Sequence, residues 1–330
     1  MNNLLRLIGR RLIALPIMAI GVTLLVFFLM ELSPIDPAWT ALGDNASDPG
    51  QVKSFNIAHG YVTDDGSETG KPIPVLLRYW NYIVGLVQGD FGIYGVGTSH
   101  HVTDLIAPAL PVTLQLTFFG LIIAVLISFP LGVLAALYRD RWPDQLIRVI
   151  SVVFIGTPSF WLAAMLVLLG LGVLKGLPVS GALPGIFDDF GGWAARMFLP
   201  AIALATPVIG QMTRVVRTSV VEELDRDYVR TALGAGIPRA VVIGRNVLRN
   251  ALITPVTVLG LRVGYLMGGA VVIEVIFGLK GMGKVLVQGV TNSQVEVVQG
   301  AALVVALSFI VVNIVVDMLY LLINPRIRSV

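Results

Sequence analysis

The chain has 330 residues, of which 56% are hydrophobic and only 13% are charged, and its net charge is +3. Soluble domains carry about 25% charged residues, so this composition excludes an ordinary soluble protein and favours one embedded in a membrane. The small net charge gives no sign of nucleic-acid binding, and the absence of cysteine excludes disulfides and thiolate metal sites.

The first predicted element is a membrane span from Leu12 to Met30, which follows Arg6, Arg10 and Arg11. Basic residues before an apolar run are also typical of a signal peptide. However, this run is longer than the apolar region of a signal peptide, and no cleavage site with small residues follows it. We therefore expect residues 1–31 to form an N-terminal tail and a retained first span.

The second predicted element is a polar loop over residues 32–104, which contains the apolar stretch Pro72 to Val87. We expect it to fold into a small extracytoplasmic subdomain. His100 and His101 lie in it, but adjacent histidines do not share a helical face and no carboxylate cluster accompanies them. They are interpreted as part of a solvated loop rather than as metal ligands, and no metal site is predicted.

Residues 105–330 are predicted to form the membrane core. A helix needs roughly 20 apolar residues to cross a membrane, and five further segments qualify or nearly do. They lie within Pro111 to Leu137, within Val149 to Leu174, around Phe198 to Thr213, from about Ala251 to Ile273 and from Val297 to about Ile323. The fold class is therefore an all-α membrane protein with six transmembrane helices. Pro158 and Pro200 interrupt two of these spans, either as packing kinks or to widen a water-lined path.

The orientation follows from the basic residues in short loops. Six spans place both termini on one side, and that side carries most of the 23 basic residues. Both termini are therefore predicted to be cytoplasmic. The same side holds the Arg-rich loop 214–250 between the fourth and fifth spans, whose pattern predicts a helix, a break at Gly236–Pro238 and a second helix. It is either a solvated connector or, as we favour, a docking element for a soluble partner.

That loop carries a recognisable pattern from Asp227 to Pro255. The pattern resembles the cytoplasmic coupling motif of ATP-binding-cassette importers, in the form used by the dipeptide, oligopeptide and nickel permease family (dipeptide permease B-type). The segments that also match are Gly89 to Gly92, Gly156 to Trp161, Leu177 to Gly181, Val271 to Leu286 and Asn324 to Arg328. The departures are Gln294 and Glu296, where an acidic residue and a proline are expected, Asn324 in place of aspartate, and an insertion over Gly60 to Lys71.

The coupling residues that the resemblance implies are Arg230, Thr231, Ala232, Leu233, Ala235, Gly236 and Ile237. Small residues at Ala232, Ala235 and Gly236 would let a short helix sit close in a groove of another protein, and Gly236 and Pro238 would turn the chain. The resemblance implies a permease subunit in the bacterial cytoplasmic membrane. Its implied partners are a second, homologous but different permease subunit, two ATP-binding subunits and an extracytoplasmic substrate-binding protein, besides membrane lipids.

We expect no catalytic residue and no cofactor in this chain, with ATP and Mg²⁺ bound by the partner subunits. Gly278 to Lys284 has the spacing of a phosphate loop, but Val285 follows where a serine or threonine should bind magnesium. Arg262 lies within the fifth span, where a charge costs roughly 3 kcal/mol. It is a candidate for the translocation path or for a structural pair with an acidic group on a neighbouring helix or subunit.

Two other classes of protein compete with this hypothesis. A secondary transporter or channel not coupled to ATP would need inverted repeats or several intramembrane acidic residues, and neither is evident. A membrane enzyme would need a nucleophile–base pair or a metal constellation. The sequence leaves the solute open among dipeptides, oligopeptides, glutathione-like peptides and nickel chelates.

Overall fold

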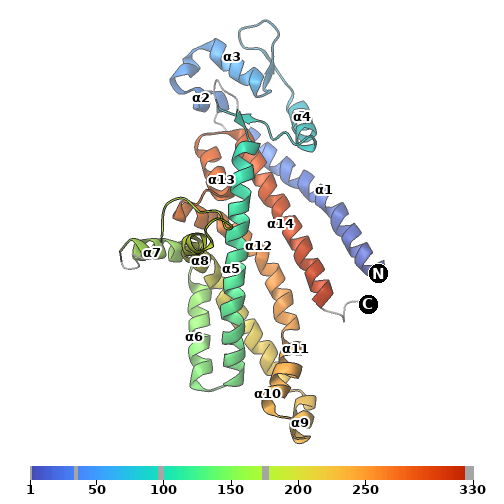
Figure 1. The fold of residues 1–330 in the computed structure, drawn as a ribbon. Coiled ribbons are helices and arrows are strands. Elements are labelled where there is room, and N and C mark those ends of the chain that lie inside the picture. Colours follow the sequence, from blue (N-terminus) through green and yellow to red (C-terminus); the bar gives the residue numbers. More distant parts are fainter. Residues whose placement is uncertain (1, 33–35, 96–99, 173–177, 324–330) are drawn as a thin grey trace. The chain divides into compact units, whose positions relative to one another are not determined.

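The computed structural model describes residues 2–32, 36–95, 100–172 and 178–323 (Figure 1). The described chain is predominantly helical, and its internal contacts divide it into two compact units. Unit 1 comprises Met1–Val112 and Lys280–Val311, and unit 2 comprises Thr113–Leu279 and Val312–Val330.

Unit 1 contains short helices and two small antiparallel sheets besides its longer helices. Its elements are α1 (Asn2–Glu31), α2 (Pro37–Leu42), the 3-10 helix η1 (Gly43–Ser47), α3 (Pro49–Ala58), β1 (Val62–Thr63), β2 (Lys71–Pro72), α4 (Val75–Val87), β3 (Ile93–Tyr94), β4 (His100–His101), the start of α5 (Thr103–Leu137), α13 (Met282–Thr291) and the first part of α14 (Val295–Ile323). Strand β1 pairs with β2, and β3 pairs with β4.

An Asp-Pro pair starts each of the two short helices α2 and α3. The carboxylate of Asp36 accepts a hydrogen bond of 2.9 Å from the backbone N–H of Ala38, and Asp48 accepts one of 2.9 Å from that of Gly50. Aspartate satisfies a free N–H at the helix start, and proline at the next position loses no hydrogen bond. These helices enclose a small core made of Ala38, Leu42, Ala46 and Phe55.

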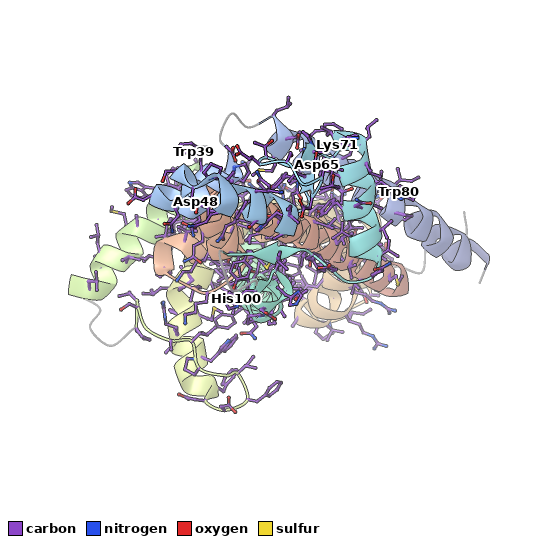
Figure 2. The ribbon with its side chains drawn as sticks, turned by 90° about the horizontal axis from the view of Figure 1, so that it is seen from above. Trp39, Asp48, Asp65, Lys71, Trp80 and His100 are labelled. Atoms are coloured by element: carbon purple, nitrogen blue, oxygen red, sulfur yellow. The ribbon has the colours of Figure 1, made fainter. Side chains whose placement is uncertain are left out.

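The predicted insertion Gly60 to Lys71 forms the β1–β2 hairpin and its turn. Lys53 on α3 holds this turn, because its ammonium group lies 2.7 Å from Asp64 Oδ1 and donates a hydrogen bond of 2.7 Å to the carbonyl of Ser67. The hydrogen bond from Lys53 lowers the pKa of the Asp64 carboxyl. Figure 2 shows Trp39 and Trp80, which are 61% and 63% exposed, on the surface of this part of the chain.

Unit 2 is built around one long buried helix. Its elements are the rest of α5, α6 (Trp142–Gly156), α7 (Ser159–Gly172), α8 (Phe190–Leu224), α9 (Asp227–Gly234), α10 (Arg239–Val241), the π-helical segment η2 (Val242–Val247), α11 (Leu248–Ala251), α12 (Ile253–Phe277) and the end of α14. Helix α8 contacts α6, α7 and α12. Its buried alanines, among them Ala201, Ala203 and Ala205, allow the close helix packing that membrane proteins favour.

Four helices of the described chain are long and apolar enough to cross a membrane: α5, α8, α12 and Val295–Val316 of α14. Helices α6 and α7 would together make a fifth span, but they bend by 98° at the break that contains Pro158. The apolar segment Pro16–Glu31 of α1 is shorter than these membrane-span candidates. The structure thus confirms a helical protein with several membrane-span candidates, while the number of six spans stays a prediction.

Two spans differ from their predicted form. The fourth, expected around Phe198 to Thr213, is the 35-residue helix α8, which begins earlier and ends later, at Phe190 and Leu224. It also includes Arg196, which is only 2% exposed and donates a hydrogen bond of 2.7 Å to the carbonyl of Phe277. The third span is the broken pair α6 and α7. The motif Asn324 to Arg328 lies outside the described residues.

Candidate functional site

The predicted docking element begins with helix α9 and a tight turn. The amide of Gly236 donates to the carbonyl of Leu233 at 3.0 Å, and the amide of Ile237 donates to that of Ala232 at 3.2 Å. Gly236 has a φ of +79°, the left-handed conformation that glycine adopts without strain. This is the Schellman arrangement that ends many helices. Pro238 then precedes α10, so the predicted sequence of helix, break at Gly236–Pro238 and helix is confirmed.

One face of α9 packs against its own unit. Val229 is 5% exposed, and Ala232 packs beside it. We call the buried set around them the α9 cluster; it consists of Ala136, Val216, Val220, Val229, Val242, Val247 and Ala251. Ala232 was expected to face a partner protein, but it packs against this cluster of its own chain.

The other face of α9 and the turn after it are exposed. The predicted coupling residues on this face are Arg230, Thr231, Leu233, Ala235, Gly236 and Ile237. Leu233 and Ile237 are 42% and 39% exposed, which leaves apolar side chains in solvent beside an arginine. An exposed apolar patch with a polar rim is typical of a surface that binds another protein.

Glu223, at the end of α8, holds α9 and α11 in place. Its Oε1 accepts a hydrogen bond of 3.0 Å from the Tyr228 hydroxyl on α9 and one of 3.2 Å from the Asn250 amide on α11. Burial raises the pKa of Tyr228, so its hydroxyl remains a donor at neutral pH. The sequence alone does not single out Glu223, because its partners become neighbours only after folding.

A continuous helical path leads from this turn to the membrane helix α12. Helix α10, the π-helical segment η2 and α11 follow one another without a gap, and α12 begins two residues later at Ile253. Val242 and Val247 of η2 are buried in the α9 cluster. Single-turn π-helical segments are rare and often occur at functional sites. A displacement of α9 would therefore reach α12 through packed elements.

Arg262 lies on α12, half-buried. None of the described acidic residues forms an ion pair with it, and its Nε has no hydrogen-bond partner among the described residues. Of the two hypotheses, a structural pair within the described part of this chain is therefore excluded. An acidic group of this chain outside the described side chains, an acidic group of a neighbouring subunit and a passing solute remain.

The glycine-rich segment Gly278 to Lys284 forms the turn after α12 and the first residues of α13. Gly278, with a φ of +65°, ends α12, and the amide of Leu279 donates to the carbonyl of Glu274 at 2.9 Å. Helix α13 begins at Met282. His100 and His101 lie exposed on β4, and among the described residues no group of three or more His, Cys, Asp or Glu is placed to hold a metal ion.

Comparisons with known proteins give consistent matches. The family model "Binding-protein-dependent transport system inner membrane component" matches residues 128–329. The chain is similar to the probable D,D-dipeptide transport system permease protein of Escherichia coli (strain K12), with 35% identity over 93% of each chain. It is similar to a putative peptide transport system permease protein of Brucella abortus (strain 2308), with 36% identity over 96% of each chain.

Two further similarities complete the comparison. The glutathione transport system permease protein of Escherichia coli (strain K12) is 36% identical over 93% of this chain and 94% of its own. Among solved structures, the crystal structure of an amino acid ABC transporter with histidines matches with a TM-score of 0.48 and 20% identity, over 68% of this chain and 94% of that one.

Proposed function

Because the chain belongs to the family of binding-protein-dependent transport system inner membrane components, we propose that it is the permease subunit of an ATP-binding-cassette importer for peptides or related small solutes. The relatives named above, which are permeases for peptides, a dipeptide and glutathione, support this solute class. In this proposal the chain is not an enzyme: it forms part of the path, and separate subunits hydrolyse ATP.

The observation that carries the coupling role is the exposed face of α9. It presents Leu233 and Ile237 to solvent while Val229 and Ala232 anchor the helix on the α9 cluster. Because one side of the helix is packed on its own unit and the other side is apolar and exposed, a partner bound to the exposed side could move the helix together with that unit. We assign the docking of the ATP-binding subunits to this face, with Arg230, Thr231, Ala235 and Gly236 as contacts.

The remaining assembly follows the family. A second, homologous permease subunit completes the membrane path, two ATP-binding subunits bind ATP and Mg²⁺ on the cytoplasmic side, and an extracytoplasmic binding protein delivers the solute. The Arg-rich loop and both termini face the cytoplasm, since most of the 23 basic residues then lie on the side that favours them. Closure of the ATP-binding subunits would move α9, and the Glu223 hydrogen bonds and η2 would transmit that movement to α8 and α12.

The test is uptake by the assembled complex in proteoliposomes. Peptide uptake should require ATP, the binding protein and the ATP-binding subunits together. Uptake driven by an ion gradient without the ATP-binding subunits would contradict the proposal and favour a secondary transporter or channel.

A further inference from the structure

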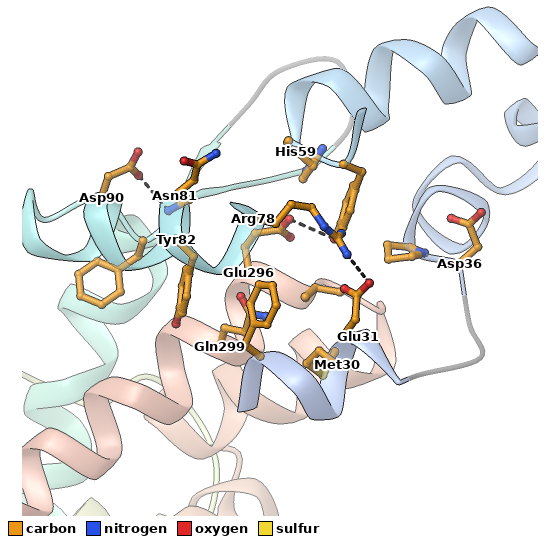
Figure 3. Close-up of a pocket in the computed structure, with 18 residues that line it drawn as sticks. Met30, Glu31, Asp36, His59, Arg78, Asn81, Tyr82, Asp90, Glu296 and Gln299 are labelled. Carbon is orange, nitrogen blue, oxygen red and sulfur yellow. Dashed lines mark hydrogen bonds and ion pairs between the residues drawn. The ribbon is translucent and has the colours of Figure 1, made fainter. Parts of the chain in front are cut away.

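A cavity of about 520 Å³ lies in unit 1, where the end of α1, the segment after α3, α4 and the start of α14 meet (Figure 3). This volume lies within the range of small-molecule sites, roughly 300–1,000 Å³. Aromatic side chains form much of its apolar wall: Phe27, Tyr61, Tyr82 and Phe91. All of its lining residues belong to unit 1, and the coupling role of α9 makes no use of them.

The charged lining of this cavity is mainly acidic. Four carboxylates, one guanidinium and one imidazole line it: Glu31, Asp36, Asp90, Glu296, Arg78 and His59. Asp36 and Asp90 each accept a hydrogen bond of 2.9 Å from a backbone N–H, that of Ala38 and that of Gly92. The guanidinium is already engaged, because Arg78 forms an ion pair with Glu31 and lies 5.0 Å from the centroid of the Tyr61 ring. Of the four carboxylates, Glu296 is the one that in the described chain has neither an ion pair nor a hydrogen bond from the backbone N–H of another residue.

Glu296 is the carboxylate most in need of a counter-charge. Its Oε1 accepts one long hydrogen bond of 3.4 Å from the Tyr61 hydroxyl, and none of the described basic side chains forms an ion pair with it. Burial raises the pKa of Tyr61, so this hydroxyl stays protonated and donates. A carboxylate held away from water is destabilised unless a cation or several donors face it. Tyr61 supplies one donor and no charge.

One neighbour of Glu296 indicates a ligand rather than a packing site. Gln299, one turn further along α14, is 5% exposed and lines the cavity, and no described residue hydrogen-bonds its side-chain amide (Figure 3). This amide offers a second polar group without a partner among the described residues. Gly92 lets the backbone lie close to the Glu296 side chain, since a Cβ there would lie 3.2 Å from both Cβ and Cγ of Glu296.

We propose that this cavity binds the ammonium group of a small organic solute, with Glu296 as its counter-charge and the Gln299 amide oxygen as a further acceptor. The aromatic wall adds cation–π and apolar contacts for the rest of the solute. Identifying the ammonium group as the amino terminus of a peptide rests on the proposed function. The resemblance leads one to expect a proline at position 296, so the carboxylate is a feature of this chain rather than of the family pattern.

Other occupants fit the cavity less well. A metal ion would need several ligands, and the described residues contain no suitable group of three His, Cys, Asp or Glu. A lysine side chain from a docked protein would satisfy the charge of Glu296 but would leave most of the 520 Å³ and its aromatic wall unfilled. A solute that carries both an ammonium group and an apolar side chain fills both parts.

The test uses the assembled importer in proteoliposomes with two probes, Gly-Phe and N-acetyl-Gly-Phe, at the same concentration of binding protein. Glu296→Gln keeps the size of the side chain and removes its charge. It should raise the concentration of Gly-Phe that gives half-maximal ATP-dependent uptake by about ten-fold, as expected for the loss of a charged hydrogen bond. The value for N-acetyl-Gly-Phe should not change. Because the binding protein is identical in both preparations, its own selectivity cancels.

Glu68→Gln is the matched control, since Glu68 is an exposed carboxylate of the same unit and does not line the cavity. It should leave both values unchanged. A second measurement does not require the acetylated probe to be carried: 2-phenylethylamine should inhibit Gly-Phe uptake about ten-fold more weakly in Glu296→Gln than in the wild type.

The outcomes separate this inference from the proposed function. A wild-type complex that carries no peptide in an ATP-dependent way would overturn the proposed function. If the wild type transports Gly-Phe and Glu296→Gln impairs both probes equally, or neither, the cavity does not bind the ammonium group. If the variant instead raises the concentration of binding protein needed for half-maximal ATP hydrolysis, with and without peptide, the cavity receives a protein side chain and the inference is wrong.

Discussion

Arg217 donates two hydrogen bonds to the carboxylate of Asp144, from Nε to Oδ1 at 2.6 Å and from Nη2 to Oδ2 at 2.7 Å. The Asp144 side chain is fully buried at the start of α6, and Arg217 lies on α8. The backbone amide of Asp140 donates a third hydrogen bond, of 2.9 Å, to the same carboxylate. This pair fastens α6 to the central helix of unit 2.

Asp144→Asn should therefore destabilise the protein strongly. The change leaves the Arg217 guanidinium without its counter-charge, which costs about 3 kcal/mol when one partner of a buried pair is removed. Denaturant unfolding in detergent micelles measures the loss. Asp140→Asn is the control, because its side chain is 74% exposed and should change the free energy of unfolding by less than about 0.5 kcal/mol. Equal effects of the two variants would show that the pair contributes little.

Gly236→Ala should loosen the turn after α9, while Gly234→Ala should not. A Cβ would meet no heavy atom within 4 Å at either position, so the two sites differ mainly in their backbone conformation. Only Gly236 has a positive φ, where a side chain costs roughly 1–2 kcal/mol. Hydrogen–deuterium exchange of the amides from Tyr228 to Ile237 should be faster in Gly236→Ala. Unchanged exchange, or equal acceleration in Gly234→Ala, would contradict the argument.

Leu233→Ser should weaken the association with the ATP-binding subunits at least several-fold. Burying an exposed leucine contributes about 1.5–3 kcal/mol, and serine forfeits most of it. Leu76→Ser is a matched control, because Leu76 is 74% exposed on α4, outside the proposed docking face. Affinity is measured by titrating the purified ATP-binding subunits onto the membrane subunits. Identical affinity in both variants would remove Leu233 from the interface.

Tyr228→Phe should uncouple ATP hydrolysis from uptake. The variant removes the 3.0 Å hydrogen bond to Glu223 and retains the ring, at a cost of about 1 kcal/mol. Helix α9 would then move more independently of α8, so fewer peptides should enter for each ATP hydrolysed. Tyr138→Phe, on a 43% exposed tyrosine in the same unit, should leave that ratio unchanged. A ratio that stays constant in Tyr228→Phe would argue that the hydrogen bond plays no part in transmission.

Arg262→Leu distinguishes a role on the translocation path from a structural pair. If the guanidinium lies on the translocation path, uptake should fall several-fold while the complex still assembles, and Arg262→Lys should retain part of it. Size-exclusion chromatography reports assembly, and proteoliposome uptake reports transport. Unchanged uptake of every solute by an assembled Arg262→Leu complex would exclude the pathway role. Loss of assembly would instead assign Arg262 to a structural pair with an acidic group on a neighbouring helix or subunit.

The backbone of the coupling segment could be predicted because its signals are local. Gly236 and Pro238 encode a turn by their own conformational limits, and the apolar runs encode helices. The partners of Glu223 could not be predicted in this way, because Tyr228 and Asn250 meet its carboxylate only after three helices have packed. The sequence also does not distinguish a solvent-exposed carboxylate at position 223 from one that is hydrogen-bonded to neighbouring helices.

The long helix α8 and the cavity show the same limit. A lone arginine beside an apolar run usually marks the end of a span, yet Arg196 lies within α8 and its Nη2 reaches the carbonyl of Phe277. The cavity brings Glu31, Tyr61 and Arg78 together with Glu296, which is more than 200 positions away from each of the other three in the sequence. No periodicity or spacing connects residues so far apart.

The bend between α6 and α7 has a consequence for the surrounding lipid. At 1.5 Å per residue, the 15 residues of α6 extend for about 22 Å, less than the roughly 30 Å of a typical hydrocarbon layer. Because α7 turns away by 98°, it cannot supply the missing length in the same direction. A bilayer that contacts this corner becomes thinner there, unless α7 lies along its surface or belongs to a re-entrant loop. The acyl-chain length of the surrounding lipids should therefore affect this protein independently of ATP and solute.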